Sequence, residues 1–248
     1  LLIGCSMTKI DNLNFFNHYK NILFFALKRY KSNNYTLMRE YFASIFIYDI
    51  SNHINIEANL KIIDVGGSTG EFSKFLGENY KCDVINLDPF KQNHVWKTIN
   101  AEAHNMPVED DYFNLVLFRG VMEHIEPRKQ QASLDEIFRI MKNNGYGYFV
   151  IPPWFNPHAG HGLKPFHIFP FKLAKFLRNL FFNKKVKYNS LEEASLYKIT
   201  FKKMKKMIEK SGFEIIDMKD THLRFHFLCR IPILREFLIP AVAFIVKK

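Results

Sequence analysis

The spacing of apolar residues changes along the chain, and each change predicts a different element. In 12–30 and 36–54 they recur every three or four positions, which is typical of one face of a helix. From Lys61 to Val65 they form a short continuous run that stops at Gly66-Gly67, as a buried strand does. Similar runs predict further strands at 82–87, 95–101, 114–118, 146–151, 213–218 and 244–247. Helical spacing returns after Gly70, over 134–141 with an end at Asn144-Gly145, and over 201–210.

Strands that alternate with helices at this spacing predict βαβ units and a parallel sheet. The expected fold class is therefore α/β, a Rossmann-like doubly wound sheet with N-terminal helices and an inserted helical substrate cap. We place an N-terminal helical cover at 1–54, the Rossmann-like domain at 55–151 and 200–248, and an inserted basic cap or lid at 152–199. The insertion opens with a loop rich in Pro, His and aromatic residues that runs to Pro170.

Composition limits the class of protein and its surroundings. With 248 residues, 48% of them hydrophobic, the chain is long enough to bury a core and is not disordered. The net charge of +11 fits either a Lys-rich composition without functional meaning or an anionic partner, such as a phosphate-bearing substrate, nucleic acid or a membrane surface. Cys5, Cys82 and Cys229 are far apart and make no metal or redox spacing, which favours a reducing cytosol.

Neither end of the chain predicts a targeting or membrane segment. The chain begins with Leu rather than Met, and no basic and apolar leader precedes Leu2-Ile3-Gly4-Cys5, so a lipoprotein signal is not expected. The apolar stretch 225–246 contains charged residues, and its longest uncharged run, Phe237 to Val246, has ten residues. Such a run is too short to cross a bilayer. We expect a cytoplasmic protein and leave attachment to a membrane surface open.

The sharpest chemical signal is the segment Asp64-Val65-Gly66-Gly67-Ser68-Thr69-Gly70, placed where a strand turns into a helix. Glycines there let the backbone approach a ligand closely, and the following helix offers free N–H groups. Asp88 ends the next strand, where a carboxylate can accept both hydroxyls of a ribose. Asp64 would repel a pyrophosphate but attract the ammonium of a methionine moiety. This difference favours S-adenosylmethionine over a dinucleotide as the cofactor.

These motifs resemble the class I methyltransferases, specifically the small-molecule, type 11-like branch, over 60–151 and more loosely over 200–247. The resemblance also rests on 102–108, 111–116, Phe118-Arg119-Gly120 and 211–215. It implies a cofactor site that contains Asp64, Gly66, Gly67, Ser68, Gly70, Asp88, Glu102, Ala103 and Arg119. It further places Glu102 at the adenine amine, with Ala103 supplying a backbone N–H.

The sequence departs from the family pattern in three places. Ser68 occupies the usual position of the middle glycine, and Asn114 replaces the common Asp. Too few residues lie between Asp88 and Val95 for the usual second helix, so we expect a loop as the adenine-side wall.

The segment Val121–Ile125 matches the helix that follows the strand in this family. In some relatives, among them ubiquinone-pathway O-methyltransferases and small-RNA methyltransferases, a Glu-x-x-Glu-His in this helix holds a divalent metal. Gly120 stands where the first Glu would be, and we assign no metal ligand. Glu123 and His124 nevertheless leave that alternative open.

Histidines are the candidates for removing a proton from the acceptor, because their pKa lies near neutral pH. His124 follows a strand's C-terminal end, where open α/β sheets bind ligands, although it could equally pack or cap locally. His158, His161 and His167 lie in the loop after the strand 146–151, which could act as a lid made mobile by Gly160 and Gly162 or be an ordinary surface loop. We take His124, His158 and His161 as the catalytic candidates.

The stretch 172–210 holds twelve Lys or Arg against three Glu, a net charge of +9. A solvated helix face over core Phe residues is one interpretation. A contact with an anionic membrane surface and a groove for a phosphorylated sugar are two others. Nucleic acid is not expected, because no recognisable RNA or DNA module accompanies the charge.

Taken together, the residues predict an enzyme that moves a methyl group from S-adenosylmethionine to an O or N atom of a small metabolite. The layout resembles bacterial methyltransferases of sugar and surface-glycan pathways, which implies such a precursor as the acceptor. Two alternatives stay open: a peripheral membrane methyltransferase for a lipid or quinone precursor, and a non-catalytic partner subunit. The oligomeric state does not follow from the sequence.

Overall fold

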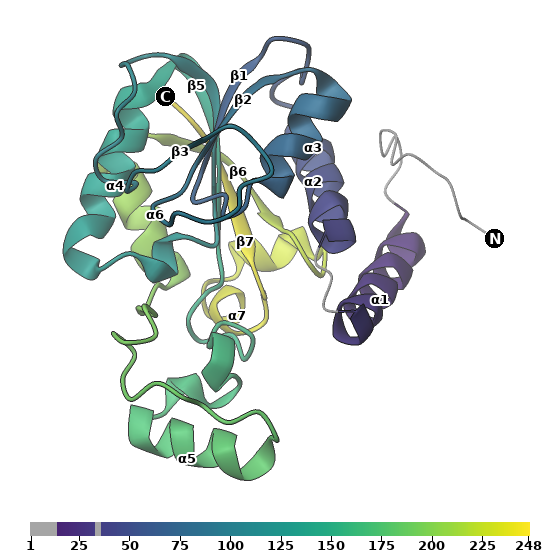
Figure 1. Cartoon of the computed structure of the whole chain (residues 1–248), viewed down its shortest axis with the longest axis vertical. Coiled ribbons are helices and arrows are strands. Elements are labelled where there is room, and N and C mark those ends of the chain that lie inside the picture. Colours follow the sequence, from purple (N-terminus) through teal and green to yellow (C-terminus); the bar gives the residue numbers. More distant parts are fainter. Residues whose placement is uncertain (1–13, 33–35) are drawn as a thin grey trace. The chain divides into compact units, whose positions relative to one another are not determined.

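The computed structural model describes residues 14–32 and 36–248, and its strands form a seven-stranded sheet in the order β3-β2-β1-β4-β5-β7-β6 (Figure 1). The expected α/β class is confirmed. By contacts the chain divides into two compact units, residues 1–100 and 101–248, which we describe separately. The segment Leu2-Ile3-Gly4-Cys5 and the first residues of the helix expected over 12–30 lie outside the described residues.

In the described part of the first unit, three helices accompany three parallel strands. Strand β1 is buried over nearly its whole length, as its uninterrupted apolar run predicts. Helix α2 packs on α3, where the Phe46 and Phe72 rings lie 5.6 Å apart between centroids. Helix α3 ends at Tyr80, and the left-handed backbone of the next residue, Lys81 (φ 57°), lets the chain turn into β2. The elements are α1 (Phe15–Ser32), α2 (Thr36–Ile50), β1 (Lys61–Val65), α3 (Glu71–Tyr80), β2 (Asp83–Leu87) and β3 (Thr98–Ile99).

In the second unit, β4 and β5 are parallel, whereas β7 runs antiparallel to both β5 and β6. The expected parallel sheet is therefore mixed. Large apolar side chains such as Phe118, Phe149 and Phe244 are fully buried in these strands. The helices and strands are β4 (Phe113–Arg119), α4 (Pro127–Ile140), β5 (Met141–Ile151), α5 (Phe171–Phe181), α6 (Phe201–Lys210), β6 (Glu214–Asp220), α7 (Pro232–Phe237) and β7 (Val242–Lys247). Four 3-10 turns complete the unit: η1 (Met122–His124), η2 (His161–Leu163), η3 (Phe166–Ile168) and η4 (His226–Arg230).

Three expectations about element boundaries need correction. Helix α4 ends at Ile140 rather than at Asn144-Gly145, because β5 already begins at Met141. Asn144 has a left-handed backbone (φ 63°) within an irregularity of the β4–β5 pairing, so this turn signal marks a bulge and not a helix end. The segment 121–125 forms only the 3-10 turn η1, and the strand expected at 95–101 shrinks to Thr98–Ile99.

Other expectations hold in the described part of the chain. Residues 88–97 contain no helix, in agreement with the loop expected there. Over residues 225–246 the chain makes η4, the short helix α7 and most of β7. Among the described helices, none combines the length and the apolar run needed to cross a bilayer.

Candidate active site

The glycine turn between β1 and α3 adopts a backbone that few residues tolerate. Gly66, Ser68 and Gly70 all have positive φ, at 76°, 56° and 89°. Gly67 is required for a different reason, because a Cβ at this position would lie 2.1 Å from Asn86 Oδ1 and 2.6 Å from Asp64 Oδ2. The turn therefore lies directly against two buried polar side chains, and a larger residue at Gly67 would push it away from them.

Asp88 lies beside this turn, as the sequence predicts for a residue that ends the second strand. The Ser68 N–H donates to Asp88 Oδ2 over 2.9 Å, and the Phe90 N–H donates to Asp88 Oδ1 over 3.0 Å. Two backbone donors thus fix the orientation of a carboxylate that is only 6% exposed. Each carboxylate oxygen has a further lone pair, so Asp88 can still accept hydrogen bonds from a ligand.

Arg39, on α2, is a part of this region that the sequence analysis did not single out. Its guanidinium contacts Glu71 Oε2 at 2.5 Å and donates to Thr69 Oγ1 over 3.0 Å. Burial alone would raise the pKa of Glu71, but hydrogen bonds from Thr69 and the backbone, together with the Arg39 charge, hold this pKa below its usual value. Arg39 thereby ties an N-terminal helix to the turn and to the first residue of α3. No motif marks it in the sequence.

Asn86, in β2, is a second residue that sequence reasoning missed. Its side chain is fully buried and donates through Nδ2 to the Ser68 carbonyl and to Thr98 Oγ1, each over 3.0 Å. In the sequence, Asn86 is simply a polar residue within the mostly apolar run 82–87. In the structure it holds the underside of the turn at Ser68.

In the second unit, Glu102 forms an ion pair with Lys129 and also contacts the His104 ring. Its Oε2 lies 2.9 Å from Lys129 Nζ and 3.0 Å from His104 Nδ1. The hydrogen bond from Lys129 is the main reason why the pKa of Glu102 lies below its usual value. The neighbouring Ala103 is nearly buried in a turn, and Arg119 ends β4. The expected roles of Glu102, Ala103 and Arg119 at a cofactor stay predictions.

Glu123, His124 and His161 form a cluster within the second unit. Each offers one ligand atom, and these atoms all lie within 4.8 Å of one another. Glu123 is 3% exposed, and its Oε2 has no hydrogen-bond partner among the described residues. Its Oε1 lies 3.8 Å from His161 Nε2, and the two imidazole rings are 4.7 Å apart between centroids. The cluster could either bind a cation or work as a carboxylate–imidazole pair.

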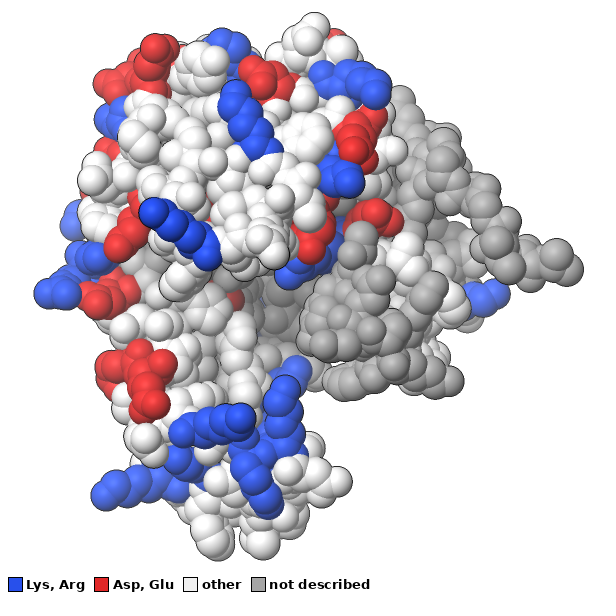
Figure 2. All heavy atoms as spheres, in the orientation of Figure 1, with Lys and Arg blue, Asp and Glu red and all other residues white. Residues whose placement is uncertain are grey.

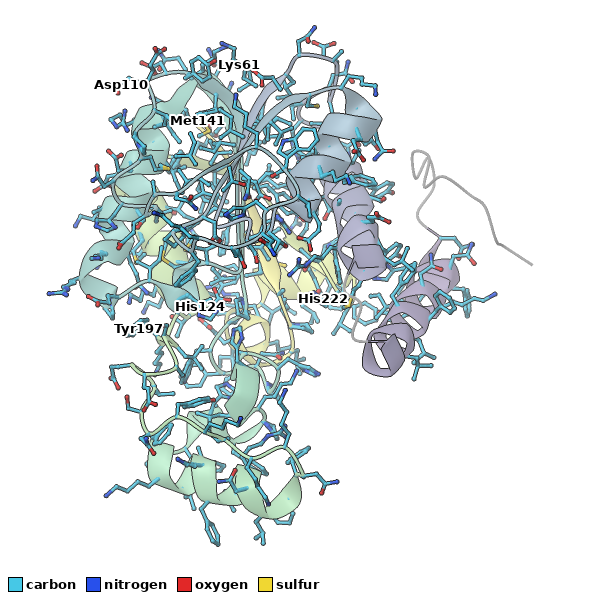
Figure 3. The ribbon with its side chains drawn as sticks, in the orientation of Figure 1. Lys61, Asp110, His124, Met141, Tyr197 and His222 are labelled. Carbon is cyan, nitrogen blue, oxygen red and sulfur yellow. The ribbon has the colours of Figure 1, made fainter. Side chains whose placement is uncertain are left out.

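The insertion that follows β5 holds this cluster in place. The Tyr197 N–H donates to the Glu123 carbonyl over 2.7 Å, and His124 Nδ1 lies 2.7 Å from the Ser195 carbonyl. Figure 3 shows His124 and Tyr197 close together where the insertion joins the sheet. A carbonyl can only accept, so His124 Nδ1 carries the proton and Nε2 is left to accept a proton or bind a metal.

The other histidines of the loop lie elsewhere. The side chain of His158 is exposed, while its backbone N–H donates to Asn156 Oδ1 over 2.9 Å. His167 is 2% exposed, and its Nε2 donates to the Trp154 carbonyl over 2.6 Å. Burial is the main cause that lowers the pKa of His167, so this residue is a neutral part of the loop's packing.

The two loop glycines lie close to other side chains, and their expected role as hinges stays a prediction. A Cβ at Gly160 would lie 2.2 Å from the His167 ring, and one at Gly162 would lie 2.8 Å from the Tyr188 hydroxyl. Trp154 is largely buried, and Asn156 donates to the Phe237 carbonyl over 2.8 Å. Close packing therefore accounts for Gly160, whereas a Cβ at Gly162 would meet only the far end of the Tyr188 side chain, and the loop is anchored at several points.

The sequence and the fold of the chain have counterparts in known proteins. Residues 30–217, most of the chain, match the family model described as a methyltransferase domain. The chain belongs to this family. The predicted class, the class I S-adenosylmethionine-dependent methyltransferases, is confirmed, and S-adenosylmethionine is the cofactor of that class. No curated protein matches the sequence.

Solved structures with the same fold are only distantly related in sequence. A SAM-dependent methyltransferase from Archaeoglobus fulgidus shares 16% identity, with a TM-score of 0.53 over 86% of this chain and 99% of the other. The 1,6-didemethyltoxoflavin-N1-methyltransferase from Burkholderia thailandensis, solved with 1,6-didemethyltoxoflavin and S-adenosylhomocysteine, shares 11%, with a TM-score of 0.57 over 97% and 92%. A [4+2]-cyclase, SpnF, shares 12%, with a TM-score of 0.51 over 83% and 80%.

Proposed function

We propose that this chain transfers a methyl group from S-adenosylmethionine to an oxygen or nitrogen atom of a small metabolite. The observation that carries the proposal is the Asp88 carboxylate, held 2.9 Å from the Ser68 N–H in the glycine turn. An acid beside a turn that begins a helix suits a ribose-bearing ligand. Asp64, fully buried beneath Gly67, adds a negative charge that disfavours a pyrophosphate there.

The described residues fit such a cofactor. Gly66, Gly67 and Gly70 have no side chain, so the backbone can approach a ligand closely at these positions, and Asp88 would accept the ribose hydroxyls. We propose Asp64 for the ammonium of the methionine moiety, directly or through water, and Glu102, Ala103 and Arg119 as further contacts on the strength of the family resemblance. When bound, the cofactor supplies an activated methyl group on a sulfonium.

The protein's main task is then to align the acceptor and to remove its proton. Alignment of the acceptor atom with the methyl carbon and the sulfur can lower the barrier by roughly 7–11 kcal/mol. The acceptor forms its bond to the carbon as the carbon–sulfur bond breaks, and the proton must go to a base. We propose His161 for this role, because the buried Glu123 carboxylate 3.8 Å away would stabilise the imidazolium that forms. His124 and His158 remain the other candidates.

Two acceptor classes are favoured by different features. The resemblance to sugar and surface-glycan methyltransferases, together with the basic stretch 172–210, supports an anionic sugar precursor. The exposed apolar side chains of α5 support instead a lipid or quinone precursor reached at a membrane surface. A small-molecule acceptor in general agrees with the Burkholderia methyltransferase, which was solved with 1,6-didemethyltoxoflavin bound.

Catalysis itself needs a test, because the same fold also occurs in a [4+2]-cyclase. Calorimetry should detect binding of S-adenosylmethionine and of its demethylated product, but not of NAD. Methyl-labelled cofactor should then be incubated with separate pools of sugar nucleotides, amines, phenols and prenylated quinone precursors. Label in one pool identifies the acceptor class. Cofactor binding without transfer to any pool would favour the non-catalytic alternative, and tight NAD binding in its place would overturn the proposal.

A further inference from the structure

The basic stretch 172–210 contains two helices that differ in what they expose. Helix α6 buries Phe201, Met204, Met207 and Ile208, and most of its lysines are exposed. That is the ordinary arrangement of a surface helix. Helix α5 buries only Ala174 and exposes apolar side chains instead.

The exposed apolar side chains of α5 lie on one face. Leu173, Phe176 and Leu180 are spaced by three and four residues, and they are 44%, 62% and 62% exposed. We call these three residues the α5 stripe. Phe169 before the helix and Phe181 at its end extend the exposed apolar surface, at 44% and 65%. Single exposed apolar residues are ordinary, but a continuous row on one helix indicates an interaction surface.

The opposite face of α5 is firmly packed. Ala174 forms a small core with Leu163 and Val186, which Phe166, Phe171, Tyr188 and Leu191 surround. Lys175 donates to the Tyr188 carbonyl over 2.8 Å, and the Val186 N–H donates to Asn179 Oδ1 over 2.8 Å. The α5 stripe therefore cannot turn inward without breaking these contacts.

Positive charge surrounds this apolar row. Between residues 171 and 187 the chain has six Lys or Arg and no Asp or Glu. Lys172 lies next to Leu173, and Lys184, Lys185 and Lys187 follow the helix with exposed side chains. Figure 2 shows the blue Lys and Arg side chains gathered around white surface on this segment.

We propose that the α5 stripe docks onto an anionic lipid bilayer. An apolar row with a lysine border is the pattern of a helix that lies in the membrane interface, with its apolar side chains among the acyl chains and its lysines at the headgroups. At 11 residues, α5 is roughly 16 Å long, about half of a hydrocarbon core, so it lies on the bilayer and does not cross it. This inference does not rest on the proposed methyl transfer.

The charge distribution favours a bilayer over other occupants. Nucleic acid would be held by the lysines but would leave the apolar row without a partner. A second copy of this chain would bring the same unbalanced positive charge to the interface, which costs energy at low salt. An anionic bilayer satisfies both the apolar and the charged part of the surface.

Vesicle co-sedimentation with the whole chain tests the proposal. Vesicles of phosphatidylcholine and phosphatidylglycerol should pellet the protein, whereas pure phosphatidylcholine should not. The double variant Leu173→Gln/Phe176→Ser should lower the partition coefficient about tenfold or more. Phe90→Ser, which removes an aromatic ring that is even more exposed (71%) from another part of the chain, should leave the partition coefficient unchanged.

A matched pair of charge variants tests the lysines. Lys172→Gln/Lys184→Gln/Lys187→Gln should weaken binding by roughly fivefold per lysine, the effect expected for a charge at a bilayer surface. The α6 triple variant Lys202→Gln/Lys206→Gln/Lys210→Gln changes the net charge equally and should have less than about a twofold effect. Equal losses in both variants would mean that only net charge matters, and would overturn the role of α5.

Two further measurements distinguish a loss of lipid binding from misfolding or a change in oligomeric state. Phe176→Trp should show a blue-shifted tryptophan emission and weaker acrylamide quenching only when anionic vesicles are present. Sedimentation velocity should show the same oligomeric state for the wild type and the Leu173→Gln/Phe176→Ser variant. Absence of wild-type binding to anionic vesicles, an unchanged emission, or a dimer that this variant dissociates would overturn the proposal. Methyl transfer without vesicle binding would leave the proposed function intact while this inference fails.

Discussion

At the scale of single residues, the hydrogen bonds already made within the protein decide what a side chain can still do for a ligand. Each carboxylate oxygen of Asp88 accepts a hydrogen bond from a backbone N–H, and these two bonds hold the side chain in position. His124 gives one ring nitrogen to the Ser195 carbonyl and keeps the other. His167 is fixed at the Trp154 carbonyl and is buried, so it has a structural role.

Replacement of Asp88 by Ala should weaken binding of S-adenosylmethionine. Two ribose hydroxyls would lose a charged acceptor, and hydrogen bonds to charged groups contribute roughly 1.5–3 kcal/mol, which corresponds to an affinity about ten- to hundredfold lower. Asp88→Asn keeps one acceptor oxygen but turns its NH2 group toward one of the two backbone N–H donors, so it should weaken binding as well. Asp83→Ala removes the same charge from the exposed start of β2 and serves as the control. Unchanged calorimetric affinity in Asp88→Ala would remove Asp88 from the site.

Replacement of His161 by Ala should reduce turnover by about 10²–10⁴-fold, the usual effect of losing a general base. Affinity for S-adenosylmethionine should barely change, because this role concerns the acceptor. His158→Ala removes an exposed histidine from the same loop, and we expect it to retain more activity than His161→Ala. Normal turnover in single variants of His124, His158 and His161 would show that alignment alone carries the reaction.

A chelator separates a base from a metal ligand at the cluster of Glu123, His124 and His161. Activity that disappears with chelator and returns with a divalent ion would make these residues a metal site. In that case His124→Ala and Glu123→Gln should reduce binding of the ion measured without any substrate. Activity that is insensitive to chelator supports the carboxylate–imidazole pair of Glu123 and His161.

The buried His167 should make the protein less stable in acid. Burial lowers its pKa in the folded protein from the value of 6.5 that it has when exposed, so the unfolded chain binds the proton more tightly. The stabilising contribution is complete above pH 6.5, falls as the pH drops below this value, and levels off below the folded pKa. His167→Gln keeps a donor for the Trp154 carbonyl but does not titrate. Urea unfolding should show a smaller loss of unfolding free energy between pH 7.5 and 5 for His167→Gln than for the wild type. The same loss in both proteins would contradict the role of His167 in acid sensitivity.

At the scale of elements, the sequence predicted most helices and strands, because each apolar run either fills the sheet or covers it. It failed where a turn signal had two meanings. Asn144-Gly145 is a common helix end, yet here it lies in a bulge of β5, since the strand pairing with β4 overrides the local preference. Gly160, which the sequence suggests as a hinge, also packs closely against the His167 ring, and this contact could not be predicted from the sequence.

The glycine turn offers a matched pair of substitutions at this scale. Gly67→Ala would place a methyl group 2.1 Å from Asn86 Oδ1, so the turn or the strand must shift, at a cost of about 1–3 kcal/mol and with loss of cofactor affinity. Ser68→Gly should be tolerated, because the backbone of Ser68 has φ 56° and glycine adopts this region without strain. Chemical denaturation and calorimetry of both variants give the comparison. A stable Gly67→Ala variant with normal cofactor affinity would contradict the close packing.

At the scale of the whole molecule, sequence motifs were enough for the family and the fold but not for the contacts of the site. The segment 64–70 and Asp88 are close to the sequence motif of the methyltransferase family, so these parts of the site could be predicted directly from the sequence. Arg39 and the cluster of Glu123, His124 and His161 depend on segments that are far apart in the chain, and such proximity follows only from tertiary packing. The exposure of the apolar face of α5 could not be predicted from the sequence either, because a basic and Phe-rich helix can bury its aromatic rings or expose them.

Ligand linkage tests the central assignment on the whole chain. A ligand that binds only the folded protein stabilises it by about 2.7 kcal/mol at a hundredfold excess over its Kd. For a chain of this size that corresponds to an increase in Tm of roughly 5–10 °C. We expect this increase with S-adenosylmethionine and with S-adenosylhomocysteine, a much smaller one for Asp88→Ala at the same concentration, and none with NAD. The α5 double variant should respond like the wild type, since its substitutions lie on an exposed helix face away from the glycine turn in sequence. A Tm that rises with NAD but not with S-adenosylmethionine would mean that the Gly66–Gly70 turn serves a dinucleotide, in spite of the carboxylate beneath it.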